Sequence, residues 1–199
     1  MRIIAGDYRG RVLKAPKGDG TRPTTDRVRE ALMSVVASAR GGFDGAVVLD
    51  AFAGSGALGL ESISRGAAMA HFYERDGAAM RTLADNVRTL GIETLGRSAR
   101  ARLHRDDVLK NPPVHARPAF DLVFFDPPYA TDPHTIASLV STLDQAGSLA
   151  PDVLVSYEYA KSDDSAVCDA LASLQWEPVS KKQYGDTGLA LFGRKHDRS

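Results

Sequence analysis

The segment FDLVFFDPPYATD, residues 120–132, places an acid, two prolines and an aromatic ring in a row, at Asp126, Pro127, Pro128 and Tyr129. Each proline fixes φ at about −65° and lacks a backbone donor, and each keeps the preceding residue extended. The carbonyls of Asp126 and Pro127, with the Asp126 carboxylate, therefore form a rigid group of acceptors suited to an –NH2 group, beside a ring on which a base could stack.

This group of acceptors suits methylation of an exocyclic amino group, whose lone pair is delocalised into the base. Acceptors on both N–H bonds would return the lone pair to nitrogen and stabilise the cation that forms during transfer. The base would have to be flipped out of its stack to reach them. A turn-forming Asp before proline is the alternative; it explains the acid and the prolines but not the coincidence with Tyr129.

A second motif, VVLDAFAGSGALGLE, contains a literal G-x-G-x-x-G at Gly54, Gly56 and Gly59. Such a turn aims backbone N–H groups and a helix N-terminus at a bound group. The spacing alone favours a dinucleotide, with Glu74 placed for the ribose. Asp50, directly before the loop, would repel a pyrophosphate but could hold an amino group. A ligand with an adenosine end and a cationic amino-acid end, such as S-adenosylmethionine, fits both features.

The elements that must position these residues alternate between strand and helix along the chain. Strands are expected at 46–50, 68–74, 99–105, 120–126 and 152–159, and helices at 57–65, 77–90, 134–147 and 165–174. Two final strands, WEPVSKKQY and LALFGRK, are joined by Gly185-Asp186-Thr187-Gly188 and must be antiparallel, because parallel strands need a long crossover. The pattern predicts a doubly wound α/β sheet, mostly parallel, with an antiparallel C-terminal hairpin.

In such a sheet, ligands bind outside the carboxyl ends of the strands. Asp50, Glu74, Asp106 and Asp126 each end a predicted strand, so we expect them to line one rim. Asp106 could accept a hydrogen bond from an adenine amino group, and Asp107 could offer a neighbouring backbone N–H. An ordinary helix N-cap is the alternative for both.

Ahead of the sheet, residues 1–14 alternate apolar and polar and predict a short hairpin. A loop at 15–23 and a helix from about Asp26, capped by Thr24 or Thr25, complete an N-terminal extension. We therefore expect an extension at 1–40 and a main domain at 41–199.

The chain of 199 residues has no net charge, but residues 1–29 carry +5, residues 181–199 carry +3 and the rest carry −8. Basic ends suggest a polyanion-facing surface and the acidic middle a pocket for a cation, with scattered solvated charge as the alternative. The single Cys168 is expected to be a buried thiol, and the five histidines show no metal-ligand spacing. No apolar run suggests a membrane span or a secretory leader, so we expect a cytoplasmic protein.

Across nearly its whole length the chain resembles the RsmD family, through MRIIAGDYRGR, RPTTDRVREALMSVV, LDAFAGSGALGLESISRGA, DPPY and KKQYGDTGLALF in that order. DPPY alone resembles the (N/D/S)-P-P-(Y/F) motif of methyltransferases that act on adenine N6, guanine N2 or a glutamine amide. The family resemblance implies a seven-stranded class I methyltransferase fold and S-adenosylmethionine as methyl donor. It further implies methylation of N2 of guanine-966 in bacterial 16S rRNA, within the small ribosomal subunit or a late assembly particle. We expect the enzyme to be a monomer.

The resemblance also implies roles for single residues. The methionine end of the cofactor would lie against Asp50, Phe52, Ala53, Gly54, Ser55 and Gly56. Glu74, followed by Arg75, would hold the ribose, Asp106 or Asp107 the adenine, and Asp126 to Tyr129 the target base. The RNA would meet the basic ends of the chain, at Arg2, Arg9, Arg11, Lys14, Arg22, Thr24, Arg27, Arg29, Lys181 and Lys182.

Two other functions remain open at this point. A nicotinamide-dependent oxidoreductase is favoured by the literal glycine motif. A non-catalytic ribosome-binding module would keep the fold alone, and the intact Asp126 and Tyr129 argue against it.

Overall fold

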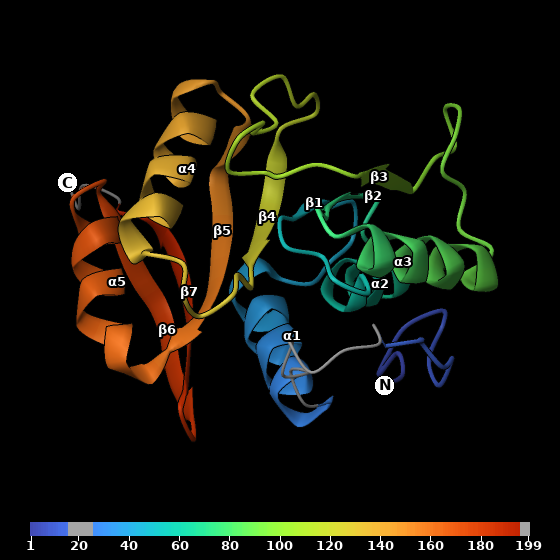
Figure 1. Cartoon of the computed structure of the whole chain (residues 1–199), viewed down its shortest axis with the longest axis horizontal. Helices are drawn as coiled ribbons and strands as arrows, with labels where there is room; N and C mark the ends of the chain where they lie inside the picture. Colours follow the sequence, from blue (N-terminus) through green and yellow to red (C-terminus); the bar gives the residue numbers. More distant parts are fainter. Residues whose placement is uncertain (16–25, 196–199) are drawn as a thin grey trace.

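A computed structural model describes residues 1–15 and 26–195, which form one seven-stranded sheet in the order β3-β2-β1-β4-β5-β7-β6 (Figure 1). Strands β1 to β5 are parallel wherever they pair, and β7 lies antiparallel to both β5 and β6. This confirms the predicted sheet. The strands are β1 (Val47–Asp50), β2 (Met69–Tyr73), β3 (Ala101–His104), β4 (Phe120–Phe125), β5 (Leu149–Ala160), β6 (Trp176–Tyr184) and β7 (Thr187–Arg194).

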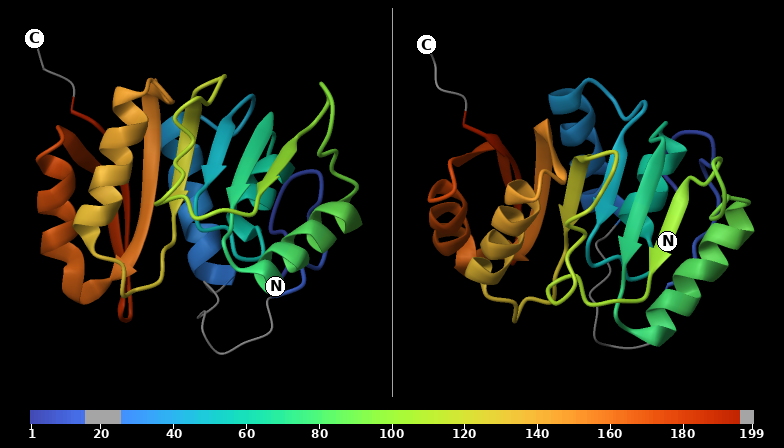
Figure 2. Two further views of the ribbon diagram at one scale, coloured as in Figure 1. Left: turned by 45° about the horizontal axis from the view of Figure 1, so that its top comes forward. Right: turned by 90° about the horizontal axis from the view of Figure 1, so that it is seen from above.

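Helices cover both faces of the sheet (Figures 1 and 2). One core lies between the sheet and the helices α4 (Pro133–Gln145) and α5 (Asp164–Ala172), which follows the short η1 (Lys161–Asp163). The other core lies under α1 (Asp26–Arg40), α2 (Ala57–Ser64) and α3 (Gly77–Leu90). Among the described helices, none is long and apolar enough to cross a membrane.

Local signals in the sequence set several helix ends. The Asp76 side chain accepts hydrogen bonds from the N–H groups of Ala78 and Ala79 and so caps α3. Asp132 caps α4 in the same way, with Pro133 in the first turn. Residues 126–132, which we call the reaction segment, lie between β4 and α4. The segment is therefore fixed at one end by β4 and at the other by the Asp132 helix cap.

The C-terminal hairpin is tighter than predicted. Strand β7 begins at Thr187, so the turn is reduced to Gly185-Asp186. Gly188 lies within the ladder opposite Tyr159, and a Cβ at this position would come within 2.3 Å of the Tyr159 ring. The glycine that suggested a turn is therefore needed for close packing within a strand.

The N-terminal segment pairs with itself as a short antiparallel hairpin, as predicted, and it also docks on helices. An antiparallel bridge between Arg2 and Val12 joins its two arms, together with backbone hydrogen bonds such as the one from Ile3 N to the Arg11 carbonyl at 2.9 Å. The fully buried Glu61 of α2 accepts hydrogen bonds from Ile4 N at 2.8 Å and Ala5 N at 3.0 Å. A strand edge leaves backbone N–H groups without partners in a sheet, and here the Glu61 carboxylate accepts hydrogen bonds from two of them.

A second anchor is Asn86 of α3, which is also buried. Its Oδ1 accepts from Lys14 N at 2.8 Å, and its Nδ2 donates to the carbonyls of Lys14 and Ser55, both at 3.0 Å. Ile3 and Leu13 pack in the same core as α1 to α3. The described part of the N-terminal segment therefore shares the core of the main domain, and a domain boundary after residue 40 stays a prediction.

Arg29 corrects one sequence-based expectation. We predicted a phosphate contact, but the residue is 1% exposed, and its guanidinium donates to the Arg2 carbonyl and to Asp26. The helical period explains the error, since Arg29 lies three and four residues before Leu32 and Met33 on the buried stripe of α1.

We expect Glu61→Ala to destabilise the fold by about 3–5 kcal/mol, because it removes the acceptor of two backbone N–H groups and the partner of Arg65. Urea unfolding measures this loss. Glu30→Ala, at an exposed position of α1, serves as the control. A loss no larger than that of the control would show that Glu61 is not the anchor of the N-terminal segment.

Candidate functional site

Four carboxylates lie on one face of the sheet at the carboxyl ends of four neighbouring strands. Asp50 ends β1, and its partner in β4 is Phe124, which packs in the core beneath α1 to α3. Side chains alternate across a strand, so Asp126, two residues after Phe124, faces the same side. Glu74 after β2 and Glu158 near the end of β5 follow the same alternation. Three of these acids were predicted at the rim, and Glu158 was missed.

The glycine loop is held directly by Glu74. Gly54 N donates to Glu74 Oε2 at 2.8 Å, and Asp76 N donates to Oε1 at 2.7 Å. Gly54 and Gly56 both have positive φ, at 54° and 83°. A side chain at Gly56 would also meet Leu83, 2.3 Å from its Cβ. A carboxylate offers about four lone-pair positions, so these two bonds leave Glu74 able to accept from a ribose hydroxyl as well.

Asp50 occupies a different place from the one expected for a cofactor ligand. It is 2% exposed, and its Oδ2 accepts a hydrogen bond from Gly59 N of α2 at 2.9 Å. Burial raises the pKa of Asp50 to about 7; the Gly59 bond lowers it and Glu74 raises it. The carboxyl group therefore lies beneath the loop and supports α2, which corrects the prediction that it faces the ligand. The sequence shows a strand-ending acid but not the helix that closes over it.

The two acids after β3 cap the turn that follows them. Asp106 Oδ1 accepts from Asp107 N at 2.8 Å and from the Asn111 side chain at 2.9 Å, and these bonds lower the pKa of Asp106. Asp107 accepts from Leu109 N and lies 3.5 Å from the Arg75 guanidinium. The capping alternative describes the contacts of both acids, and an adenine contact stays a prediction.

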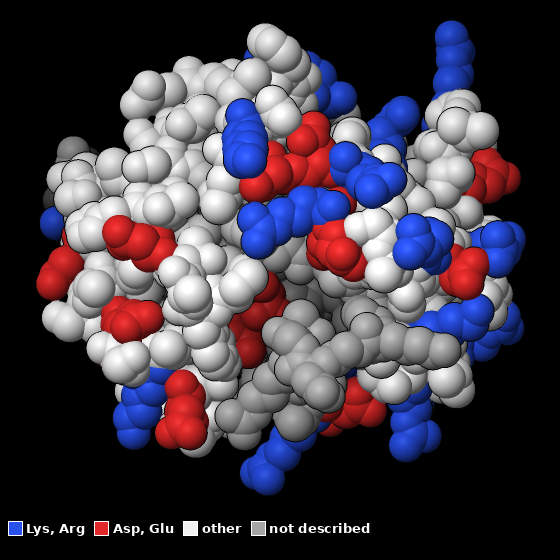
Figure 3. Space-filling view, viewed as in Figure 1, with Lys and Arg blue, Asp and Glu red and all other residues white. Residues whose placement is uncertain are grey.

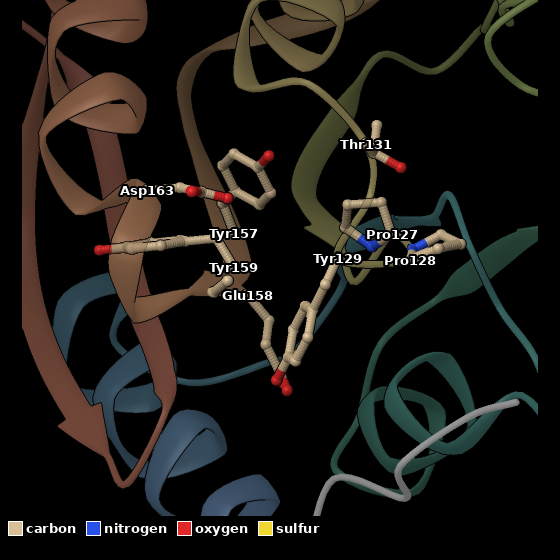
Figure 4. A pocket seen from close by; sticks show the side chains of 9 residues that line it. Pro127, Pro128, Tyr129, Thr131, Tyr157, Glu158, Tyr159 and Asp163 are labelled. Atoms are coloured by element: carbon tan, nitrogen blue, oxygen red, sulfur yellow. The ribbon is translucent and has the colours of Figure 1, made fainter. Parts of the chain in front are cut away.

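The reaction segment forms a corner against the end of β5 (Figure 4). Asp126 is half-buried, Pro127 is buried, and Tyr129 is 42% exposed. The Tyr129 hydroxyl lies 2.7 Å from the Thr187 hydroxyl at the start of β7. The corner contains a pocket, which is lined by Pro127, Pro128, Tyr129, Thr131, Tyr157, Glu158, Tyr159, Ala160 and Asp163. Tyr129 is thus a ring tethered at its tip, with much of its surface open for stacking.

Thr187 and Glu158 are the residues that sequence reasoning missed here. Thr187 was assigned to a turn, and its role depends on a strand 58 residues from Tyr129 in sequence. For Glu158 a signal existed: in the predicted strand, Leu154, Ser156 and Glu158 alternate with apolar residues, which puts an acid on one face near the strand end.

The predicted RNA contacts are spread over several places. Exposed positions are Arg2, Arg9, Arg11, Lys14, Arg27, Lys181 and Lys182, whereas Arg22 and Thr24 lie outside the described residues. Several are partnered: Arg11 donates to the Thr89 carbonyl, Lys14 pairs with Asp85, and Lys181 pairs with Asp164. On the face in Figure 3, basic and acidic side chains are interspersed.

Two smaller expectations can be compared with the described residues. Cys168 is half-buried rather than fully buried, and Lys181 Nζ lies 3.2 Å from its sulfur. Within residues 1–15 and 26–195, no group of three or more His, Cys, Asp or Glu is arranged to hold a metal ion.

Comparison with solved structures defines the class of the fold. The Escherichia coli protein yhhF matches with a TM-score of 0.77 at 34% identity, covering 98% of each chain. The ribosomal protein L11 methylase of Lactobacillus delbrueckii, at 18% identity, shares the fold with a TM-score of 0.65, covering 85% of this chain and 80% of that one. Together with the strand order and the antiparallel β7, these likenesses define a class I methyltransferase fold.

The family follows from the sequence comparisons. The model of the family described as "Conserved hypothetical protein 95" matches residues 1–193. "Ribosomal RNA small subunit methyltransferase D" of Escherichia coli K12 is 36% identical, covering 98% of this chain and 90% of that protein. The chain belongs to this family, the RsmD family.

We expect Asp50→Asn to flatten the pH dependence of stability. Because the pKa of Asp50 is raised in the folded protein from 3.8 to about 7, its stabilising neutral form is lost as pH rises through this range. Asparagine still accepts from Gly59 N but does not ionise. The unfolding free energy of the variant relative to the wild type should therefore rise between pH 4 and 7, by roughly 1.4 kcal/mol for each increase of one in pH.

Urea unfolding across this pH range tests the prediction, with Asp152→Asn, an exposed acid of β5, as the matched control. A difference between Asp50→Asn and wild type that does not change with pH would contradict it.

Proposed function

We propose that this protein transfers the methyl group of S-adenosylmethionine to the exocyclic N2 amino group of a guanine in 16S rRNA of the small ribosomal subunit. The observation that carries the proposal is the placement of the acceptor corner at Asp126 and Tyr129 on the same sheet face as the glycine loop and Glu74. The name of the Escherichia coli relative supports the choice of rRNA. Guanine-966 as the target rests on the family resemblance.

The residues at the rim fit this cofactor. The loop at 53–56 has left-handed glycines that bring backbone close to a ligand, and Glu74 keeps acceptor capacity for a ribose. When bound, S-adenosylmethionine supplies an electrophilic methyl group on a sulfonium. The antiparallel β7 departs from the six parallel strands of a dinucleotide domain, so a nicotinamide-dependent reaction is not favoured.

The chain's own part in the reaction is positioning and charge stabilisation. Asp126 and the Pro127 carbonyl would accept from the two hydrogens of the target amine, which restores its lone pair and stabilises the developing positive charge. Tyr129, tethered by Thr187, would stack on the base and set its plane. Holding the amine in line with the methyl group supplies much of the remaining rate. The Asp126 carboxylate can take the proton after transfer.

The setting of the reaction is part of the same proposal. We expect the substrate to be the small ribosomal subunit or a late assembly particle in the cytoplasm, and the enzyme to act as a monomer. Tritium transfer from labelled S-adenosylmethionine to small subunits from cells lacking the gene, followed by mapping of the label, tests it. Label on an adenine, or no label on the rRNA, would overturn it.

Asp126→Ala should lower turnover about 100-fold or more, comparable with the loss of one electrostatic stabiliser, with little change in cofactor affinity. Asp126→Asn keeps an acceptor oxygen and should stay within about tenfold of the wild type. Single-turnover kinetics and calorimetric titration of the cofactor measure the two effects. Equal losses in turnover and cofactor affinity would make Asp126 a cofactor ligand instead.

Thr187→Val should lower turnover about fivefold, because a lost neutral hydrogen bond costs about 1 kcal/mol. Thr187→Ser keeps the hydroxyl and should restore turnover. If serine and valine behave alike in the same kinetic assay, the tether to Tyr129 does not position the base.

A further inference from the structure

Glu158 is a buried acid in the wall of the reaction corner. It is 8% exposed, and it lines the same pocket as Pro127, Pro128 and Tyr129. Figure 4 shows its side chain running alongside the Tyr129 ring, away from Tyr157 and Tyr159, its neighbours in sequence. Burying a carboxylate costs free energy, and the residues before it on this strand face, Leu154 and Ser156, carry no charge. The free-energy cost of burying Glu158 suggests that its carboxylate has a role in the pocket.

The strand register places Glu158 beside Asp126. Strands β4 and β5 are parallel, with Phe124 opposite Ser156 and Phe125 opposite Tyr157. Two residues beyond the first of these pairs come Asp126 and Glu158, on the same face of adjacent strands, whose backbones lie about 4.8 Å apart. A base whose amino group is held by Asp126 would therefore present the neighbouring part of its edge to Glu158.

The chemistry of the base decides what Glu158 can do there. In guanine the atom next to the N2 amine is N1, which carries a hydrogen and donates. In adenine the N1 beside the N6 amine has no hydrogen and accepts. An ionised carboxylate only accepts, and its four or so lone-pair positions leave room for a base after bonds within the protein are made. Glu158 would attract the guanine edge and repel the adenine edge.

We infer that Glu158 selects guanine by accepting a hydrogen bond from N1–H while Asp126 holds N2. This inference rests on the proposed function, because it assigns a specificity role within the same site. The amino-group acceptors define the reaction, and Glu158 distinguishes between bases that carry an amino group.

The test uses small-subunit particles assembled with ligated 16S rRNA that carries guanine or 2-aminopurine at the target position. 2-Aminopurine keeps the N2 amine but lacks both the N1 hydrogen and the O6 oxygen of guanine, so the change in preference caused by Glu158→Gln, rather than the base swap alone, reports on the N1 contact. A site built to bond a substrate hydrogen rejects an analogue that lacks it. The wild type should therefore prefer guanine by about 100-fold or more in kcat/KM. Glu158→Gln, whose amide can also donate, should reduce that preference to below about tenfold.

Glu177→Gln is the matched control, since it makes the same change at an exposed position at the start of β6, away from the corner. It should keep the wild-type preference. Thermal melting and cofactor titration establish that Glu158→Gln is folded; if it is not, Glu158→Asp replaces it. Aspartate keeps the acceptor but withdraws it by one methylene, so turnover on guanine should fall while turnover on 2-aminopurine stays within about twofold.

An equal loss on both bases in the folded variant would overturn the inference and reduce Glu158 to a structural residue. An unchanged preference would overturn it as well. In either case the wild type would still methylate guanine, so the proposed function would stand. Failure of the wild type to label guanine particles would overturn the proposed function itself, and the inference with it.

Discussion

The alternation of side chains along parallel strands governs the whole site. Because β2, β1, β4 and β5 are adjacent and parallel, their carboxyl ends meet at one edge. Because side chains alternate, every second residue at that edge faces α1 to α3. A shift of one residue in any of these strands would turn its acid to the opposite face. Asp50, Glu74, Asp126 and Glu158 can work together only in this register.

The same edge divides its acids between support and chemistry. Asp50 is enclosed and holds the first turn of α2. Glu74 holds the loop and remains half-exposed. Glu158 lines the pocket beside Tyr129, and Asp126 directly precedes Pro127 of the same pocket. The degree of burial changes along the rim. Asp50 and Glu158 are buried, the first bonded to α2 and the second in the wall of the pocket, whereas Glu74 and Asp126 are partly exposed, where a carboxylate can meet a charged or polar ligand.

Much of this arrangement could be predicted from the sequence. Strand and helix alternation and the Gly-bounded connection at 185–188 predict the sheet, including the reversed β7, because these signals are local. What could not be predicted depends on which surface packs on which. Arg29 looks like a surface arginine until α1 is docked, and Asp50 looks like a ligand until α2 closes over it. The role of Thr187 depends on its hydrogen bond with Tyr129, a contact between distant residues that no local sequence pattern predicts.

The anchoring of the N-terminal segment has a consequence for the order of folding during synthesis. Ile4 N cannot donate to Glu61 until 57 more residues have been synthesised, and Lys14 N cannot donate to Asn86 until 72 more have been synthesised. At about 5–20 residues per second, the second delay lasts roughly 4–14 s. Residues 1–14 can form their own hairpin early, but they reach the acceptors on α2 and α3 only after this delay. Until then this basic segment lacks the two side chains that anchor it to the main domain.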